Sequence, residues 1–106
     1  MVGLTKTIAK EWGRFNIRCN AVAFGMINTR LINAPTEDSS ITIKGRKVPQ
    51  GIRGAGNPDE APGLAITPLG RPGTVDEAAG ACLMLASDHA SYITAHCLEV
   101  TGGFGA

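Results

Sequence analysis

The chain has 106 residues, of which 10 are Lys or Arg and 9 are Asp or Glu, so its formal net charge is +1. This length allows one small domain or part of a larger one, and the 43% hydrophobic content excludes a wholly disordered chain. The near-neutral charge gives no support to a nucleic-acid binder, and no apolar run approaches the roughly 18 residues of a membrane span. We therefore expect a globular chain with neither nucleic acid nor membrane as a partner.

The charges are unevenly distributed along the chain. Residues 1–53 hold nine Lys or Arg and three Asp or Glu, whereas residues 54–106 hold one and six. Two readings stay open: solvated surfaces that attract each other or a partner copy, or a basic half that receives an anionic cofactor or substrate.

The three cysteines, Cys19, Cys82 and Cys97, lie in apolar settings without a Cys-x-x-Cys spacing. The apolar pattern of the first ten residues is interrupted by Lys6 and Lys10, so it does not read as a secretory signal. We expect reduced cysteines that act as small core residues, and a cytoplasmic location.

The first predicted elements are a helix over 2–13 and a strand over 17–23. The apolar residues at helical spacing are Leu4, Ile8 and Trp12, with Ala9 beside them. Gly25 ends the strand, and residues 26–33 are expected to begin a short helix. Residues 34–73, rich in Pro and Gly, read as a lid or insertion. Within it, residues 41–48 predict a hairpin that turns at Gly45.

The second half predicts a helix over about 75–87 and a strand over 96–101. Thr74 and Glu77 have the spacing of a capping box at the start of this helix. Because the second strand follows the first through a helical crossover, we expect the two strands to pair in parallel. Two parallel strands leave two open edges, so the pattern is typical of the end of a larger sheet.

Three stretches make the sequence recognisable. They are Val2-Gly-Leu-Thr-Lys-Thr-Ile-Ala-Lys-Glu-Trp-Gly13, Ile17-Arg-Cys-Asn-Ala-Val-Ala-Phe-Gly-Met-Ile-Asn-Thr29, and a third stretch that runs from Pro68-Leu-Gly-Arg-Pro-Gly-Thr74 through Ala86-Ser-Asp88 and then includes Ser91-Tyr-Ile-Thr94 and Val100-Thr-Gly-Gly103. In this order they resemble the C-terminal part of the short-chain dehydrogenase/reductase family, above all its members that are like 3-oxoacyl-carrier-protein reductases and carbonyl reductases.

The resemblance implies an α/β fold, the C-terminal portion of a doubly wound Rossmann-type parallel sheet, in the order helix, strand, lid, helix, strand. It implies one partial domain over 1–106, with the lid at 34–73 inside it. It also implies NAD or NADP as the cofactor, a small carbonyl or alcohol as the substrate of the complete enzyme, and assembly as a homo-oligomer or with a full-length relative.

The resemblance assigns cofactor contacts to Gly25, Ile27 and Thr29. In the family's pattern, Gly25 lets the backbone approach the cofactor, Ile27 backbone groups meet the nicotinamide carboxamide, and the Thr29 hydroxyl meets the carboxamide or the pyrophosphate. Phe24 stands where the family usually has Pro, which loosens the turn because Phe does not fix φ.

Other features of the family have no counterpart in these residues. Gly51-Ile-Arg-Gly-Ala-Gly56 lacks the strand-turn-helix context of a dinucleotide loop, so we read it as part of the lid. The only tyrosine, Tyr92, precedes His96 where the family's catalytic pattern needs Lys, and we expect Tyr92 to pack between the last helix and strand. We therefore predict no catalytic residue. We predict no metal site either, because the spacing of Asp88, His89, His96 and Cys97 matches no known ligand pattern.

Two hypotheses about function remain open. The chain is the C-terminal part of an NAD(P)-dependent oxidoreductase and is not catalytic alone, or it is a non-catalytic oligomerisation module or truncated product that pairs with full-length relatives. A basic patch on the lid, formed by Lys44, Arg46, Lys47 and Arg53, is a solvated hairpin or a contact for an acidic carrier of an acyl chain.

Overall fold

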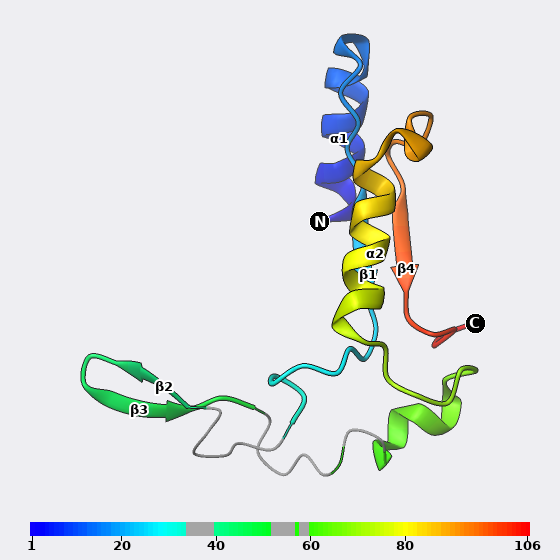
Figure 1. Ribbon diagram of the computed structural model, residues 1–106. Helices are drawn as coiled ribbons and strands as arrows, with labels where there is room; N and C mark the ends of the chain where they lie inside the picture. Colours follow the sequence, from blue (N-terminus) through cyan, green and yellow to red (C-terminus); the bar gives the residue numbers. More distant parts are fainter. Residues whose placement is uncertain (34–39, 52–56, 58–59) are drawn as a thin grey trace. The chain divides into compact units, whose positions relative to one another are not determined.

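Figure 1 shows the computed structural model, which describes residues 1–33, 40–51, 57 and 60–106. Two compact units are found, one of residues 1–24 with 76–100 and the other of residues 25–75 with 101–106. The single partial domain over 1–106 stays a prediction, as does the lid at 34–73, part of which lies outside the described residues. No helix in the described ranges is long and apolar enough to cross a membrane.

The first unit contains two α-helices and one sheet. Its elements are α1 (Val2–Trp12), β1 (Ala21–Phe24), α2 (Val75–Ala86) and β4 (Cys97–Val100), with short 3-10 helices at Gly13–Phe15 and Asp88–Ala90. Both predicted helices and both predicted strands are therefore confirmed, although each strand is shorter than predicted. The capping box at the start of α2 stays a prediction.

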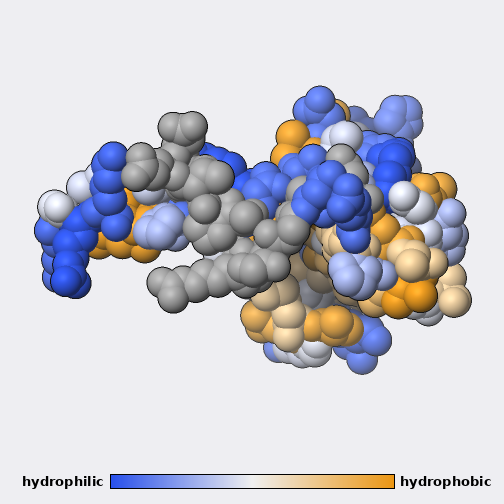
Figure 2. Space-filling view, turned by 90° about the horizontal axis from the view of Figure 1, so that it is seen from below, coloured by the Kyte–Doolittle hydropathy of each residue, from blue (hydrophilic) through white to orange (hydrophobic). Residues whose placement is uncertain are grey.

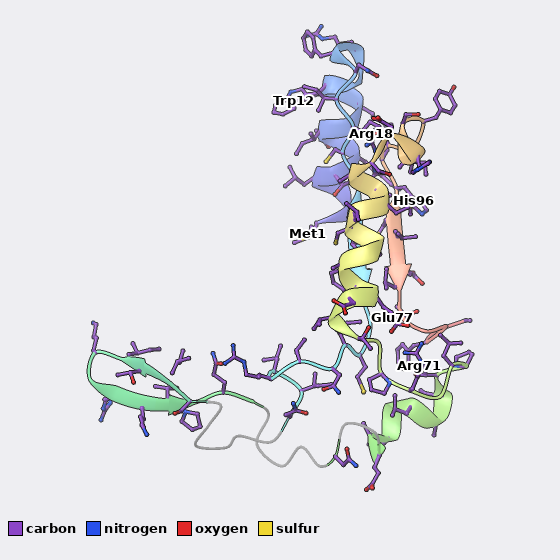
Figure 3. All side chains as sticks on the ribbon, viewed as in Figure 1. Met1, Trp12, Arg18, Arg71, Glu77 and His96 are labelled. Carbon is purple, nitrogen blue, oxygen red and sulfur yellow. The ribbon has the colours of Figure 1, made fainter. Side chains whose placement is uncertain are left out.

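The buried face of α1 overlaps the predicted apolar stripe only at Ala9. Thr5 and Ala9 are buried, whereas Leu4 and Trp12 are exposed, and Trp12 extends away from the helix in Figure 3. Thr5 and Ala9 are one turn apart and small, so their face admits a close approach of neighbouring chain. The Thr5 hydroxyl stays satisfied by donating to the Met1 carbonyl at 3.2 Å. Apolar spacing thus located the helix but not its packed face.

The sheet of the first unit consists of β1 and β4, paired in parallel from Ala21–Cys97 to Phe24–Val100. This confirms the predicted parallel pairing. Two further hydrogen bonds extend the contact before β1: the Ala21 N–H donates to the His96 carbonyl and the Ala95 N–H donates to the Cys19 carbonyl, both at 2.8 Å. Ala95 has φ of 60°, which interrupts extended backbone and shortens the regular pairing.

The connection from α2 to β4 is held by Arg18 and Asn20. The Arg18 guanidinium donates to the carbonyls of Ser87 (3.4 Å) and Ile93 (3.3 Å), and it lies beside this connection in Figure 3. The Asn20 amide donates to the Ile93 carbonyl at 2.9 Å and accepts from the His96 N–H at 3.1 Å. These side chains satisfy carbonyls that follow the end of the helix.

The expected packing role of Tyr92 is wrong. Tyr92 is 101% exposed, whereas Ala90, two residues earlier, is 0% exposed. Within the 3-10 turn at Asp88–Ala90, the small Ala90 side chain is buried. Tyr92 lies on the following turn, where its side chain is exposed to solvent.

The second unit contains the predicted hairpin, formed by β2 (Ser40–Ile43) and β3 (Arg46–Pro49). Its turn consists of Lys44 and Gly45, with φ of 49° and 76°. Two successive positive φ values are typical of the turn that matches the twist of paired strands, and glycine adopts them most readily. The prediction of a turn at Gly45 is confirmed.

The rest of the second unit is built on short contacts rather than long elements. A 3-10 helix spans Pro62–Ile66, and its Leu64 is buried. The short helix expected over 26–33 is not formed: Ile27 instead makes an isolated parallel bridge with Gly73. A pairing across this distance in sequence overrides the weak local preference of so short a segment.

Candidate functional site

The loop after β1 is where the predicted cofactor residues lie, and its first residue, Gly25, sits against Thr101. A Cβ built on Gly25 would lie 2.8 Å from the Thr101 Cα and 3.2 Å from its Cβ. Gly25 does not have a positive φ, so the need for glycine here is steric. Gly25 follows β1 and Thr101 follows β4 along the chain. In open α/β sheets, ligands bind outside these carboxyl ends.

Ile27 is held in extended backbone by Gly73. The Gly73 N–H donates to the Met26 carbonyl at 2.9 Å, and the Asn28 N–H donates to the Gly73 carbonyl at 2.8 Å. Both bonds use the neighbours of Ile27, so its own N–H and C=O point away from Gly73. Among the residues described, neither group forms a hydrogen bond.

The third predicted cofactor residue, Thr29, is half-buried two positions further along the loop. Its carbonyl accepts from the Ile32 N–H at 3.2 Å, which starts a turn. Its hydroxyl has no hydrogen-bond partner in the described part of the chain. The loop therefore presents a backbone donor, a backbone acceptor and a hydroxyl within three residues. A primary carboxamide, which has one carbonyl oxygen and one NH₂ group, is complementary to that set.

Two residues that contact this loop, Gly73 and Thr101, were not predicted from the sequence. Gly73 belongs to the stretch Pro68–Thr74 and Thr101 to Val100–Gly103, which were recognised only as marks of the last helix and strand. The repeated glycines were the available signal: Gly102 and Gly103 have positive φ and lie against Thr67 and Pro68, where added Cβ atoms would come within 3.1 and 2.7 Å.

The remaining candidates are not gathered into a site. No group of three His, Cys, Asp or Glu residues that could hold a metal ion occurs within the described ranges, and the three cysteines are unpaired thiols. In the basic patch, Lys44, Arg46 and Lys47 are exposed on the hairpin, and Arg53 lies outside the described residues. Residues 52–56, which make up most of the glycine-rich stretch 51–56, also lie outside the described residues.

Solved structures identify the class of fold. The chain superposes on a blue fluorescent protein from a metagenomic library, in complex with NADPH, with a TM-score of 0.68 and 27% identity, covering 99% of this chain and 34% of that one. It superposes on a short chain dehydrogenase from Bacillus anthracis with a TM-score of 0.64 and 31% identity, covering 99% and 32%. The predicted Rossmann-type C-terminal portion is confirmed.

Sequence comparisons identify the family. A family model described as enoyl-(acyl carrier protein) reductase matches residues 1–67 and 50–105. The chain is 41% identical over 100 residues to 3α-hydroxysteroid dehydrogenase of Mediterraneibacter gnavus, covering 94% of this chain and 32% of the relative. It is 39% identical over 103 residues to a 3-oxoacyl-(acyl-carrier-protein) reductase of Thermotoga maritima, covering 97% and 34%. The chain belongs to the short-chain dehydrogenase/reductase family of oxidoreductases, and it spans about a third of the length of these relatives.

Proposed function

We propose that this chain supplies the last two strands, the lid and the nicotinamide-side loop of an NAD(P)-dependent oxidoreductase that acts on a carbonyl or alcohol substrate. The observation that carries the proposal is the bridge between Ile27 and Gly73, which leaves the Ile27 N–H and C=O without a hydrogen bond to any residue that the structure describes. The family assignment supports the same cofactor class, and both NAD and NADP remain open.

In this proposal the chain's own part is to orient the cofactor's carboxamide. When the cofactor is bound, the Ile27 N–H would donate to the carboxamide oxygen, the Ile27 C=O would accept from its NH₂ group, and the Thr29 hydroxyl would add a further hydrogen bond. When bound, the nicotinamide supplies or accepts a hydride. Fixing the carboxamide fixes the face of the ring that meets the substrate, and such orientation contributes to rate by removing unproductive geometries. The packing of Gly25 on Thr101 keeps the start of the loop in place.

We further propose that these 106 residues do not catalyse hydride transfer alone. Proton transfer to a carbonyl oxygen requires an acid held within hydrogen-bond reach, and a tyrosine requires a nearby cation to serve near neutral pH. The only tyrosine, Tyr92, is fully exposed, and it precedes His96 rather than a lysine at the family's spacing.

The test measures binding and turnover separately on the same preparation. We expect saturation-transfer NMR to detect contact of the nicotinamide protons of NADH or NADPH with the chain, and we expect neither cofactor to be oxidised with carbonyl substrates. Ile27→Pro removes the backbone donor and should abolish the transfer, whereas the matched control Ile27→Ala keeps the backbone and should retain it. Equal signals from both variants, or turnover by the pure chain, would contradict the proposal.

A second candidate function, an interaction module, is favoured by the exposed apolar side chains of both helices. Large apolar residues lie exposed on α1 and on α2, namely Val2, Leu4, Trp12, Val75, Leu83 and Met84. Large apolar side chains that are exposed in this number are candidates for burial against a partner. Sedimentation velocity should then show an oligomer that Leu83→Ser dissociates. To test pairing with a relative, the chain would be co-expressed with a curated relative truncated before the matched segment. Recovered reductase activity would support the first function as well.

A further inference from the structure

The hairpin of β2 and β3 has one apolar face, and this follows from its register. Ile41 pairs with Val48, and Ile43 pairs with Arg46. Paired residues and residues two apart lie on the same face of an antiparallel ribbon. One face therefore carries Ile41, Ile43 and Val48 with Arg46, and the opposite face carries Ser40, Thr42, Lys47 and Pro49.

The aliphatic side chains of this face are exposed. Ile41, Ile43 and Val48 are 40%, 51% and 40% exposed. Neither strand makes an extensive contact with another helix or strand within the described residues, apart from the pairing of β2 with β3. An isolated two-stranded hairpin is marginally stable in water, and three or more strands or a packed face are usually needed. The exposed aliphatic side chains therefore favour a partner that takes up apolar surface.

The same hairpin carries three cations around that face. Lys44 lies in the turn, Arg46 lies on the apolar face, and Lys47 lies on the opposite face. All three are exposed, and none forms an ion pair or side-chain hydrogen bond with another described residue. Residues 40–51 contain no Asp or Glu, and the nearest acidic residues in the sequence are Glu37 and Asp38.

The placement of these charges discriminates between possible partners. Cations on two opposite faces and a turn cannot converge on one phosphate, so a small anion is a poor match. A second copy of the hairpin is disfavoured because like charges would face each other. The apolar face spans only two strands of four residues each, which is a small area for a stable protein interface. An anionic lipid surface accepts aliphatic side chains below its head groups and cations at the level of the head groups. Lys47 lies on the opposite face, but its long, flexible side chain can extend to the head groups.

We propose that the hairpin of residues 40–49 is a membrane-surface element that inserts Ile41, Ile43 and Val48 at the head-group boundary of anionic bilayers. Lys44, Arg46 and Lys47 contact the lipid phosphates. The expectation of no membrane partner was based on the lack of a spanning segment, which does not bear on surface binding. The proposal does not depend on the oxidoreductase function, because it concerns the hairpin and not the loop of Ile27.

The experiment is co-sedimentation of the full chain with vesicles of phosphatidylcholine, with and without phosphatidylglycerol. Binding is expected only to the anionic vesicles, and it should weaken as salt is added. The variant Lys44→Gln, Arg46→Gln, Lys47→Gln should lower the partition coefficient at least about tenfold, since each cation near an anionic surface contributes roughly fivefold. The matched control Lys6→Gln, Lys10→Gln, Arg14→Gln removes the same net charge from exposed positions outside the hairpin, and should bind nearly as wild type does.

A second measurement reports insertion itself. In a Trp12→Phe background, Val48→Trp should show blue-shifted emission and quenching by brominated lipid, whereas Thr42→Trp on the opposite face should show neither. The proposal is overturned by absent binding to anionic vesicles, by equal loss in the two triple variants, or by equal spectra of the two tryptophans. Hairpin-dependent self-association, or binding to an acidic protein but not to vesicles, would also overturn it.

Discussion

The contact between Gly25 and Thr101 predicts both the direction and the magnitude of the change in the free energy of unfolding when Gly25 is replaced. In Gly25→Ala, the new methyl carbon would lie 2.8 Å from the Thr101 Cα, 3.2 Å from its Cβ and 3.3 Å from its carbonyl oxygen. Because the nearest atom belongs to the backbone, no side-chain rotation relieves the overlap. Overpacking of this kind costs about 1–3 kcal/mol, and we expect the upper end of that range.

The matched control is Gly80→Ala in the interior of α2. Its Cβ would meet no heavy atom within 4 Å, and alanine is favoured over glycine in a helix by about 0.8–1.0 kcal/mol. The same chemical change should therefore destabilise at position 25 and stabilise at position 80, a difference of roughly 3–4 kcal/mol.

The assay is urea unfolding of the chain, followed by circular dichroism. With a slope of about 1–3 kcal/mol per molar urea, Gly25→Ala should lower the midpoint by roughly 1–3 M. If Gly25→Ala unfolds the chain outright, the double variant with Gly80→Ala provides a measurable background. Adding Thr101→Gly should not restore stability, since the closest contact is to the Cα. A stability of Gly25→Ala equal to wild type, or full rescue by Thr101→Gly, would refute this steric account.

The connection between α2 and β4 supplies further predictions. Asn20→Ala should cost about 2 kcal/mol, because it removes two hydrogen bonds and leaves the His96 N–H without its acceptor; a change under about 0.5 kcal/mol in urea unfolding would contradict this. Ala90→Leu should lower the melting temperature by an amount that corresponds to about 1–3 kcal/mol or more, since its site is fully buried. Tyr92→Ser should stay within about 0.5 kcal/mol of wild type, and a larger loss would restore a packing role for this tyrosine.

The local elements could be predicted because each has a signal within a few residues. The hairpin was located by β-branched residues on both sides of Gly45, and α2 by its apolar spacing. The packed face of α1 could not be predicted, because the spacing identifies apolar positions but does not show which of them contact another segment. Leu4 and Trp12 satisfy the helical pattern, yet the small Thr5 and Ala9 are buried.

The site was predicted only as far as the resemblance reaches. Gly25, Ile27 and Thr29 come from a family pattern, and their cofactor contacts stay predictions. The residues that fix them, Thr101 and Gly73, are distant in sequence and act through backbone atoms. Backbone contacts between distant segments leave almost no trace in residue type, apart from glycine where a side chain would collide.

The pairing of β1 with β4 also sets the order in which this molecule can be made. Asn20 bonds to His96 across a sequence separation of 76 residues. At a synthesis rate of about 5–20 residues per second, β1 therefore waits roughly 4–15 seconds on the ribosome before its partner strand exists. The helices and the hairpin, closed by near neighbours, can form during that interval. An apolar strand exposed for this long is an early target for chaperones, so synthesis rate over residues 25–96 should influence yield more than the same change upstream of β1.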